Sequence, residues 1–226
     1  MKLQFDAGLV ARYDRPGPRY TSYPTAVQFL PSVGEAAYGA AVASTNVGGG
    51  PLSLYVHVPF CTNPCFYCGC TRVITRNPAA GANYLQHLNE EIRLRGAQVD
   101  RSRVVDQLHF GGGSPTFLTP PQLAATIAKL GEHFQLNTGA GREFAIEVDP
   151  RTVSAADVQA LADMGFNRIS LGVQDVDAGV QAAVNRVQPL EQVRAVIEAA
   201  RHARFESVSV DLIYGLPRQN AETFMR

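Results

Sequence analysis

The stretch LSLYVHVPFCTNPCFYCGC, residues 52–70, joins a short apolar segment to a loop that contains every cysteine of the chain. Its first part, residues 52–58, is short, apolar and partly β-branched, which is typical of a buried β-strand. The cysteines follow the carboxyl end of this predicted strand. In parallel α/β folds that end is where ligands bind, so the stretch predicts both a strand and a site.

Outward from this stretch, strand patterns alternate with amphipathic helix patterns. Strands are predicted over residues 52–58, 104–110, 143–148, 168–173 and 207–213. Helices are predicted near residues 83–96, 120–134 and 189–203, and another after Ser154, where Ser154 and Asp157 resemble a capping box. Strands that alternate with helices form βαβ units with right-handed crossovers, so we predict an α/β fold with a parallel sheet.

The composition limits the classes of protein that this chain can belong to. Its 226 residues are 46% hydrophobic and 18% charged, which is enough for a sizeable core. Lys plus Arg is 20 and Asp plus Glu is 20, so there is no basic excess of the kind that nucleic-acid binding needs. No run of 18 apolar residues and no secretory h-region is present. We therefore expect a cytoplasmic protein that binds neither nucleic acid nor a membrane.

The sequence predicts two parts, an N-terminal arm over residues 1–50 and a domain over residues 51–226. Three prolines within residues 12–24 predict an extended or turned segment without helix, followed by a short helix over residues 34–43. The chain stops at Arg226, within the first turns of a helix predicted to begin near Asn220, and five strands do not close an ordinary barrel. We expect the N-terminal part of a longer protein, with an open sheet edge after the fifth strand.

The four cysteines, Cys61, Cys65, Cys68 and Cys70, lie within ten residues. Disulfides within so short a segment would close very small loops and do not suit the cytoplasm. Zinc usually takes two separated pairs of ligands, although nearby His57 could complete such a site. Thiolates suit iron–sulfur clusters, and C-x3-C-x2-C can hold three corners of a four-iron cluster with one iron left open. We predict Cys61, Cys65 and Cys68 as the ligands and expect Cys70 not to be one.

Polar or glycine-rich signals also follow the later strands, and each has a simpler structural interpretation. The glycines of residues 111–113 would let a ligand approach the backbone, or would only form a tight turn. Glu147 could bind an ammonium or a ribose hydroxyl, or cap a helix. Gln174 could be an ordinary surface amide and Arg186 a solvated charge. Asp211 is the strongest single candidate, because a carboxylate in a buried strand needs partners.

The C-x3-C-x2-C loop, with an aromatic residue before its last cysteine, resembles the signature of the radical S-adenosylmethionine superfamily. More specifically, seven segments in order resemble the oxygen-independent coproporphyrinogen III oxidases. They are RYTSYPTA (19–26), LYVHVPFC (54–61), CGC (68–70), GGGSPTFL (111–118), EVDPR (147–151), GVQD (172–175) and DLIYGLP (211–217). The resemblance covers about residues 10–225.

The resemblance implies an open, partial TIM-like barrel of six βα units, of which about five are present here, and a C-terminal domain that is absent. It implies an oxidoreductase of haem biosynthesis that decarboxylates two propionates of coproporphyrinogen III and forms protoporphyrinogen IX. A 4Fe-4S cluster, S-adenosylmethionine and an electron donor protein would serve this reaction in a protein that we expect to be a monomer. We expect this chain alone to be inactive. A related haem chaperone is the alternative, although such relatives usually lack RYTSYPTA and the fourth cysteine.

The resemblance also assigns individual residues. Tyr55, Gly112 and Glu147 would contact the S-adenosylmethionine on the cluster. Two molecules of S-adenosylmethionine are implied, and the second would contact Tyr67, Gly113, Ser114, Gln174, Arg186 and Asp211. Tyr67 replaces a common Phe and Ser114 a common Thr, so the ring and the hydroxyl are retained.

The N-terminal arm is rich in arginine and tyrosine, and two interpretations of it stay open. Arginine pairs with carboxylates through two parallel hydrogen bonds, and coproporphyrinogen III carries four carboxylates. The arm could therefore cover the substrate, or it could be a leader that only packs on the domain. The residues considered for the cover are Arg12, Arg15, Arg19, Tyr20 and Tyr23.

Overall fold

The structure is a computed structural model that describes residues 6–14, 25 and 28–225. Its contacts divide the chain into two units, residues 1–41 and 42–226, which are described separately. Helix α2 (Glu35–Gly48) extends across this division and is longer than the helix predicted over residues 34–43. A boundary between arm and domain after residue 50 stays a proposal.

In the first unit, helix α1 (Ala7–Tyr13) begins after Asp6, whose carboxylate accepts a hydrogen bond from the Leu9 N–H at 3.0 Å. The prediction that residues 12–24 contain no helix is therefore wrong for Arg12 and Tyr13. The reason is that the first proline, Pro16, lies beyond the end of α1 and so does not interrupt it. The other arm residues considered for a substrate cover lie outside the described residues; they are Arg15, Arg19, Tyr20 and Tyr23.

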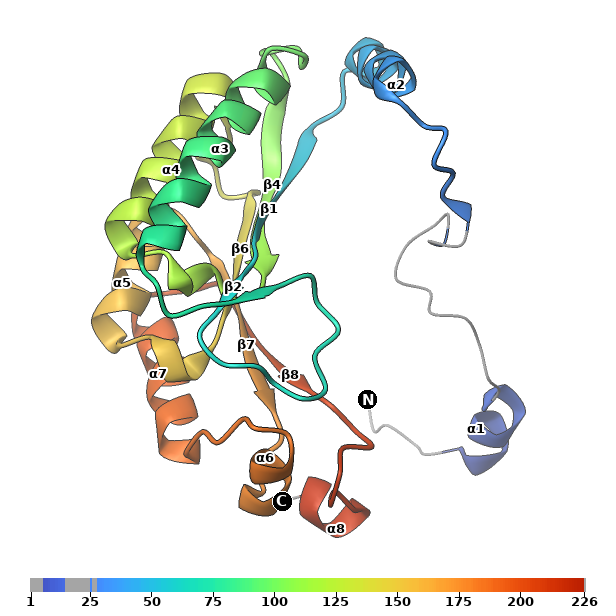
Figure 1. The fold of residues 1–226 in the computed structure, drawn as a ribbon, viewed down its shortest axis with the longest axis vertical. Helices are drawn as coiled ribbons and strands as arrows, with labels where there is room; N and C mark the ends of the chain where they lie inside the picture. Colours follow the sequence, from blue (N-terminus) through green and yellow to red (C-terminus); the bar gives the residue numbers. More distant parts are fainter. Residues whose placement is uncertain (1–5, 15–24, 26–27, 226) are drawn as a thin grey trace. The chain divides into compact units, whose positions relative to one another are not determined.

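The second unit is built on a parallel sheet in the order β1-β4-β6-β7-β8 (Figure 1). The short strand β5 pairs with the amino end of β4. The strands are β1 (Leu52–Val58), β4 (Val104–Gly112), β5 (Gln135–Leu136), β6 (Glu143–Val148), β7 (Arg168–Gln174) and β8 (Ser207–Leu212). Every pairing between them is parallel. The five predicted strands and the predicted α/β class are confirmed, and within the described residues β1 and β8 do not pair to close a barrel.

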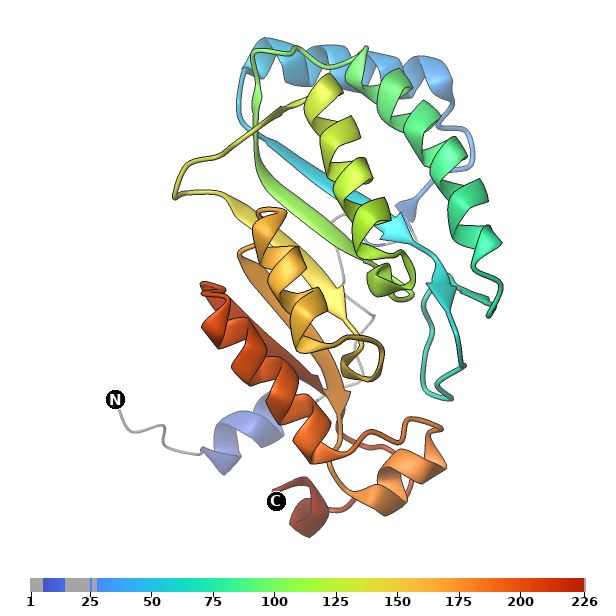
Figure 2. The ribbon, with the colours of Figure 1, turned by 90° about the vertical axis from the view of Figure 1, so that its left-hand side faces the viewer.

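Four helices lie between successive strands in the chain and cover one face of the sheet (Figures 1 and 2). They are α3 (Ala79–Gly96), α4 (Pro120–His133), α5 (Ala155–Asp163) and α7 (Leu190–His202). Two shorter helices, α6 (Ala178–Ala183) and α8 (Ala221–Phe224), lie beyond the carboxyl ends of the strands (Figure 1). The predicted capping box of α5 is present, because Ser154 accepts from the Asp157 N–H while Asp157 accepts from the Ser154 N–H. Among the described residues no helix has the length and apolar character needed to cross a membrane.

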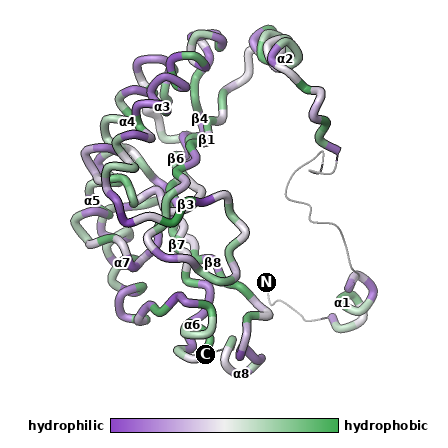
Figure 3. Tube along the Cα trace, viewed as in Figure 1, coloured by the Kyte–Doolittle hydropathy of each residue, from purple (hydrophilic) through white to green (hydrophobic). Residues whose placement is uncertain are grey.

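The core lies between the helices and the sheet. Alternate strand residues such as Leu108, Ile146 and Leu171 are fully buried there, together with Leu123 and Leu161 from the helices. Burying apolar surface stabilises the fold by about 25 cal/mol per Å². Figure 3 shows the resulting alternation of hydrophobic and hydrophilic residues along the covering helices.

The other face of the sheet is polar. Residues alternating with the buried ones point away from the helices and include Gln107, His109, Glu143, Glu147, Arg168 and Ser170. A parallel sheet is ordinarily apolar on both faces. A polar face that continues to the carboxyl ends of the strands is instead suited to holding a polar ligand.

Strand β8 differs from the prediction of a buried fifth strand. Val210 is 45% exposed and Leu212 54% exposed, and Asp211 between them is also exposed. The expectation that Asp211 lies in a buried strand is therefore wrong. The reason is that β8 is the last strand of the sheet and pairs on one side only, with β7.

Candidate active site

The cysteine loop is closed at its base by its own backbone. Two short strands, β2 (Phe60–Cys61) and β3 (Val73–Ile74), pair in parallel at the two ends of the loop. The Val73 N–H donates to the Pro59 carbonyl at 2.7 Å. Within the loop, Arg72 Nη1 donates to the Cys68 carbonyl at 2.7 Å. The spacing between the cysteines is thus held in a closed loop at the carboxyl end of β1.

The outer side of the loop is held by the segment that follows α6. The Phe66 N–H donates to the Val184 carbonyl at 3.0 Å, and Asn185 Nδ2 donates to the Pro64 carbonyl at 2.7 Å. Asn185 adopts a positive φ of 55°, a backbone conformation that asparagine tolerates better than most residues. This docking brings the next residue, Arg186, to the cysteines.

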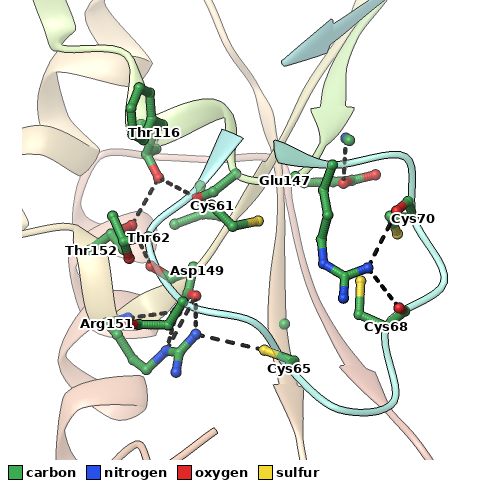
Figure 4. Close-up of a pocket in the computed structure, with 18 of the residues that line it drawn as sticks. Cys61, Thr62, Cys65, Cys68, Cys70, Thr116, Glu147, Asp149, Arg151 and Thr152 are labelled. Carbon is green, nitrogen blue, oxygen red and sulfur yellow. Dashed lines mark hydrogen bonds and ion pairs between the residues drawn. The ribbon is translucent and has the colours of Figure 1, made fainter. Parts of the chain in front are cut away.

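The four thiols are free, and Cys61, Cys65 and Cys68 are partly buried while Cys70 is exposed. In Figure 4 the sulfurs of Cys61, Cys65 and Cys68 surround one space, and Cys70 lies beyond Cys68. Burial, followed by the nearby Cys68 and Cys65, raises the pKa of the Cys61 thiol to about 11. A metal centre bound here would therefore displace protons from the loop.

Among the described residues, no group of three or more His, Cys, Asp or Glu side chains is arranged to hold a single metal ion. The ligands of a four-iron cluster bind different irons, so they stand farther apart than the ligands of one ion. Three soft thiol donors around one space therefore fit a cluster better than the closed tetrahedral site of structural zinc.

The glycine run at the end of β4 packs against the start of the cysteine loop. The Gly113 N–H donates to the Val58 carbonyl at 2.9 Å, and the Ser114 N–H donates to the Phe60 carbonyl at 2.8 Å. A Cβ on Gly113 would lie 2.7 Å from the Phe60 carbonyl oxygen. At Gly113 the backbone thus packs closely against the start of the chain's own cysteine loop, and the approach of a ligand to the glycine run stays a prediction.

Glu147, near the end of β6, is held by two donors. Its Oε2 accepts from the Gly112 N–H at 3.2 Å, and its Oε1 lies 3.0 Å from Nε2 of His109. The Tyr55 ring stacks on the His109 ring at 5.6 Å, and the Tyr55 hydroxyl lies 3.1 Å from His57 Nδ1. Burial and the Glu147 charge raise the pKa of Tyr55. The contacts with His109 and the Gly112 N–H thus fix the orientation of the Glu147 carboxylate.

Asp149 forms the most buried charged group of the site, together with Arg151 and Arg186. Its side chain is 14% exposed, and its Oδ2 lies 2.6 Å from Arg151 Nη2 and 3.2 Å from Arg186 Nη1. Burial alone would raise the pKa of Asp149. The hydrogen bonds from Arg151 and the charges of both guanidiniums outweigh it and hold that pKa below its ordinary value.

Gln174 and Asp211 complete the predicted set on neighbouring strands. Gln174 ends β7 at a positive φ of 69°, next to a register shift in the pairing of β7 with β8. Strained backbone of this kind is concentrated at functional sites. The Asp211 carboxylate accepts from the Ser170 hydroxyl at 3.1 and 3.2 Å. This serine is the partner of Asp211 that the sequence could not indicate.

These residues surround one cavity of about 470 Å³ at the carboxyl ends of the strands. Every predicted site residue except Tyr55 lines it. The lining members of that set are Cys61, Cys65, Cys68, Tyr67, Gly112, Gly113, Ser114, Glu147, Gln174, Arg186 and Asp211. The cavity is also lined by residues that were not assigned a role from the sequence, among them Asp149, Arg151 and Ser170. The signal for Asp149 and Arg151 was available, as opposite charges two residues apart directly after a strand.

Comparison with known proteins places the site in a family. The profile of the radical SAM superfamily matches residues 55–226. The chain belongs to this superfamily. The resemblance of the cysteine loop to this superfamily is thereby confirmed, whereas the assignment of Cys61, Cys65 and Cys68 as ligands stays a prediction.

Closer relatives share one name. The chain is 48% identical, over 99% of its length, to the oxygen-independent coproporphyrinogen III oxidase of Pseudomonas aeruginosa, and it covers 49% of that protein. It is 45% identical to the Escherichia coli protein of the same name, of which it covers 48%. The solved structure of coproporphyrinogen III oxidase from Escherichia coli, described as a radical SAM enzyme, matches with a TM-score of 0.89 and 43% identity over all of this chain and 49% of that one. The chain spans about half the length of the curated relatives it matches.

Proposed function

We propose that this chain provides the cluster-binding part of an oxygen-independent coproporphyrinogen III oxidase, which oxidatively decarboxylates two propionates of coproporphyrinogen III to give protoporphyrinogen IX. The observation that carries the proposal is the convergence of three thiols and the matching polar residues on one cavity. It occurs in a chain that is 45–48% identical to enzymes of that name along nearly its whole length.

In this proposal Cys61, Cys65 and Cys68 would hold a 4Fe-4S cluster and would leave one iron open for S-adenosylmethionine. When bound, the two cofactors together would supply the one-electron chemistry that removes hydrogen from the propionate before carbon dioxide leaves. The protein binds and orients these groups and keeps water away from them. The closed cysteine loop serves the first task, since its base is paired and its outer side is docked.

Glu147 is the proposed acceptor for the ammonium group of the cosubstrate. Both of its oxygens are already oriented, by His109 and by the Gly112 N–H, so little conformational entropy has to be lost on binding. Tyr55 is not among the residues that line the cavity, so its proposed contact with the cosubstrate would be made from the rim.

A second S-adenosylmethionine is proposed to contact Asp211 and Gln174, with Tyr67, Gly113 and Ser114 nearby. The exposed Asp211 carboxylate is available to accept hydroxyl or ammonium hydrogens. Arg186 is more constrained, because its guanidinium already donates to the Gly172 carbonyl and to Asp149. A ligand carboxylate at Arg186 would have to compete with these contacts.

The electron donor protein, the monomeric state, the cytoplasmic location and the covering role of the N-terminal arm are parts of the same proposal. Of the arm's arginines, Arg12 lies on helix α1 and is exposed. Deleting residues 1–26 from the complete protein is expected to weaken binding of coproporphyrinogen III. Unchanged substrate affinity would leave the arm as a leader only.

The test of the function is anaerobic incubation of the complete, reconstituted protein with coproporphyrinogen III, a reductant and S-adenosylmethionine. We expect the product mass to show the loss of both propionate carboxyl groups. Cys65→Ala should abolish cluster and turnover, whereas Cys70→Ala, the matched control in the same loop, should retain the cluster. Haem binding without decarboxylation that depends on S-adenosylmethionine would favour the haem chaperone instead.

A further inference from the structure

Asp149 lies between two guanidinium groups at the carboxyl end of β6. Its two oxygens accept from Arg151 Nε at 2.9 Å and Nη2 at 2.6 Å, and Oδ2 also contacts Arg186 Nη1 at 3.2 Å. The side chains of Asp149, Arg151 and Arg186 are 14%, 21% and 9% exposed. These three residues, named here the guanidinium cluster, carry one net positive charge because two cations surround one anion.

Both guanidiniums of this cluster also reach the sulfur of Cys65. Arg186 Nη1 lies 3.5 Å and Arg151 Nη2 3.9 Å from Sγ; Figure 4 shows the second contact. Arg72, another guanidinium bound to the cysteine loop, donates to the carbonyl oxygens of Cys68 and Cys70. Charged donors are thus directed at the Cys65 sulfur, whereas Arg72 is directed at backbone.

The backbone holds both guanidiniums in place. Arg151 follows Pro150 in a short 3-10 turn, and its own N–H donates to Asp149 Oδ1 at 3.0 Å. Arg186 Nε donates to the Gly172 carbonyl at 3.2 Å, and a Cβ at Gly172 would lie 2.8 Å from Arg186 Nη2. The absence of a side chain at Gly172 therefore lets the guanidinium lie across β7.

We propose that the guanidinium cluster raises the reduction potential of the iron–sulfur centre, because Arg151 and Arg186 donate to the sulfur of its ligand Cys65. In this proposal Asp149 positions both guanidiniums, and its negative charge limits the rise in potential. The proposal rests on the proposed function, since it requires that Cys61, Cys65 and Cys68 hold an iron–sulfur cluster. Reduction adds one negative charge to the centre. Hydrogen bonds to ligand sulfurs and net charge nearby both set the potential of such centres, so positive donors at Cys65 favour the reduced state.

The two kinds of charge in the guanidinium cluster predict shifts of opposite sign. Arg151→Gln removes a positive donor and should lower the midpoint potential. Asp149→Asn removes the opposing negative charge and should raise it. We expect each change to alter the reduction equilibrium about tenfold, from the energy of one charge near a partly buried site. For one electron, a tenfold change corresponds to about 59 mV.

The experiment is a redox titration followed by electron paramagnetic resonance, on the complete protein reconstituted without air and without S-adenosylmethionine. The matched controls are Arg168→Gln and Glu143→Gln, which disrupt a 2.7 Å ion pair. Both residues lie at the amino ends of their strands, β7 and β6, whereas the cysteines lie at the carboxyl edge of the sheet. Their potentials should equal that of the wild type. Arg151→Lys keeps the charge with fewer donors, so its potential should fall between those of the wild type and Arg151→Gln.

Shifts of Arg151→Gln and Asp149→Asn in the same direction, or no shift in either, would overturn the proposal. So would a control that shifts as far as Arg151→Gln, or an Arg151→Lys potential outside the expected interval. Iron and sulfide analysis of the wild type separates this failure from that of the proposed function. A wild type with a four-iron cluster and variants of unchanged potential would refute the guanidinium cluster's role alone, whereas a wild type without a cluster would refute both.

Discussion

A methyl group added at Gly113 would test how the glycine run supports the cysteine loop. In Gly113→Ala the new Cβ would lie 2.7 Å from the Phe60 carbonyl oxygen, 2.9 Å from the Pro59 carbonyl carbon and 3.0 Å from the Phe60 carbonyl carbon. All three atoms are backbone, so no side chain can rotate away. The end of β4 and the start of the loop have to separate.

The separation would weaken two hydrogen bonds, from the Gly113 N–H to Val58 and from the Ser114 N–H to Phe60. Each bond contributes about 1 kcal/mol, and overpacking costs about 1–3 kcal/mol more. We expect a loss of about 3 kcal/mol in the free energy of unfolding. In a protein of this size that lowers Tm by roughly 6–12 °C.

The assay is denaturant and thermal unfolding of the apoprotein, followed by the iron content after reconstitution. The control is Gly131→Ala in helix α4, where the nearest atom to an added Cβ, Leu136 Cδ1, lies 3.9 Å away. Because alanine favours helix over glycine, this variant should be unchanged or up to about 1 kcal/mol more stable. If Gly113→Ala unfolds like the wild type and binds iron fully, the backbone contact does not support the loop.

Three further predictions concern the carboxylates and their partners. In Gly172→Ala the added Cβ would lie 2.8 Å from Arg186 Nη2, so the guanidinium must move. A crystal structure of this variant should show Arg186 displaced from the Cys65 sulfur, and an unmoved Arg186 would contradict the close approach of its guanidinium to Gly172. His109→Ala removes the 3.0 Å contact to Glu147 and should weaken binding of S-adenosylmethionine to the reconstituted protein about 5–10-fold, as measured by calorimetry. Unchanged affinity would count against the role of His109 in orienting Glu147. The lowered pKa of Asp149 gives stability that is fully present above its ordinary value near 3.8 and is lost as the pH falls through the folded-state pKa. The stability difference between wild type and Asp149→Asn should therefore stay constant near neutral pH and shrink below about pH 4; a difference that grew in acid would refute the assignment.

The strands and the edge that carries the site were predictable because their signals are local. Alternating burial along β6 and β7 follows directly from the apolar pattern, and Ser154 with Asp157 marks the start of α5. The carboxyl ends of parallel strands meet at one edge. Residues as distant in sequence as Cys61 and Asp211 could therefore be expected in one site.

What could not be predicted depends on partners distant in sequence. Asp149 and Arg186 are 37 residues apart, and nothing in either segment indicates that the two pair. The exposure of Asp211 depends on β8 being the last strand of the sheet, which is a property of the sheet and not of the strand's composition. Helix α6 has only six residues, too few to show a helical period.

The most direct test of the account is the electron paramagnetic resonance spectrum of the complete, anaerobically reduced protein, recorded with and without S-adenosylmethionine. Three thiolates from Cys61, Cys65 and Cys68 should leave one iron open to the cosubstrate, so the account predicts a reduced 4Fe-4S signal that changes when S-adenosylmethionine is added. A cluster signal that ignores the cosubstrate, or a protein that takes up zinc and forms no iron–sulfur cluster, would contradict it.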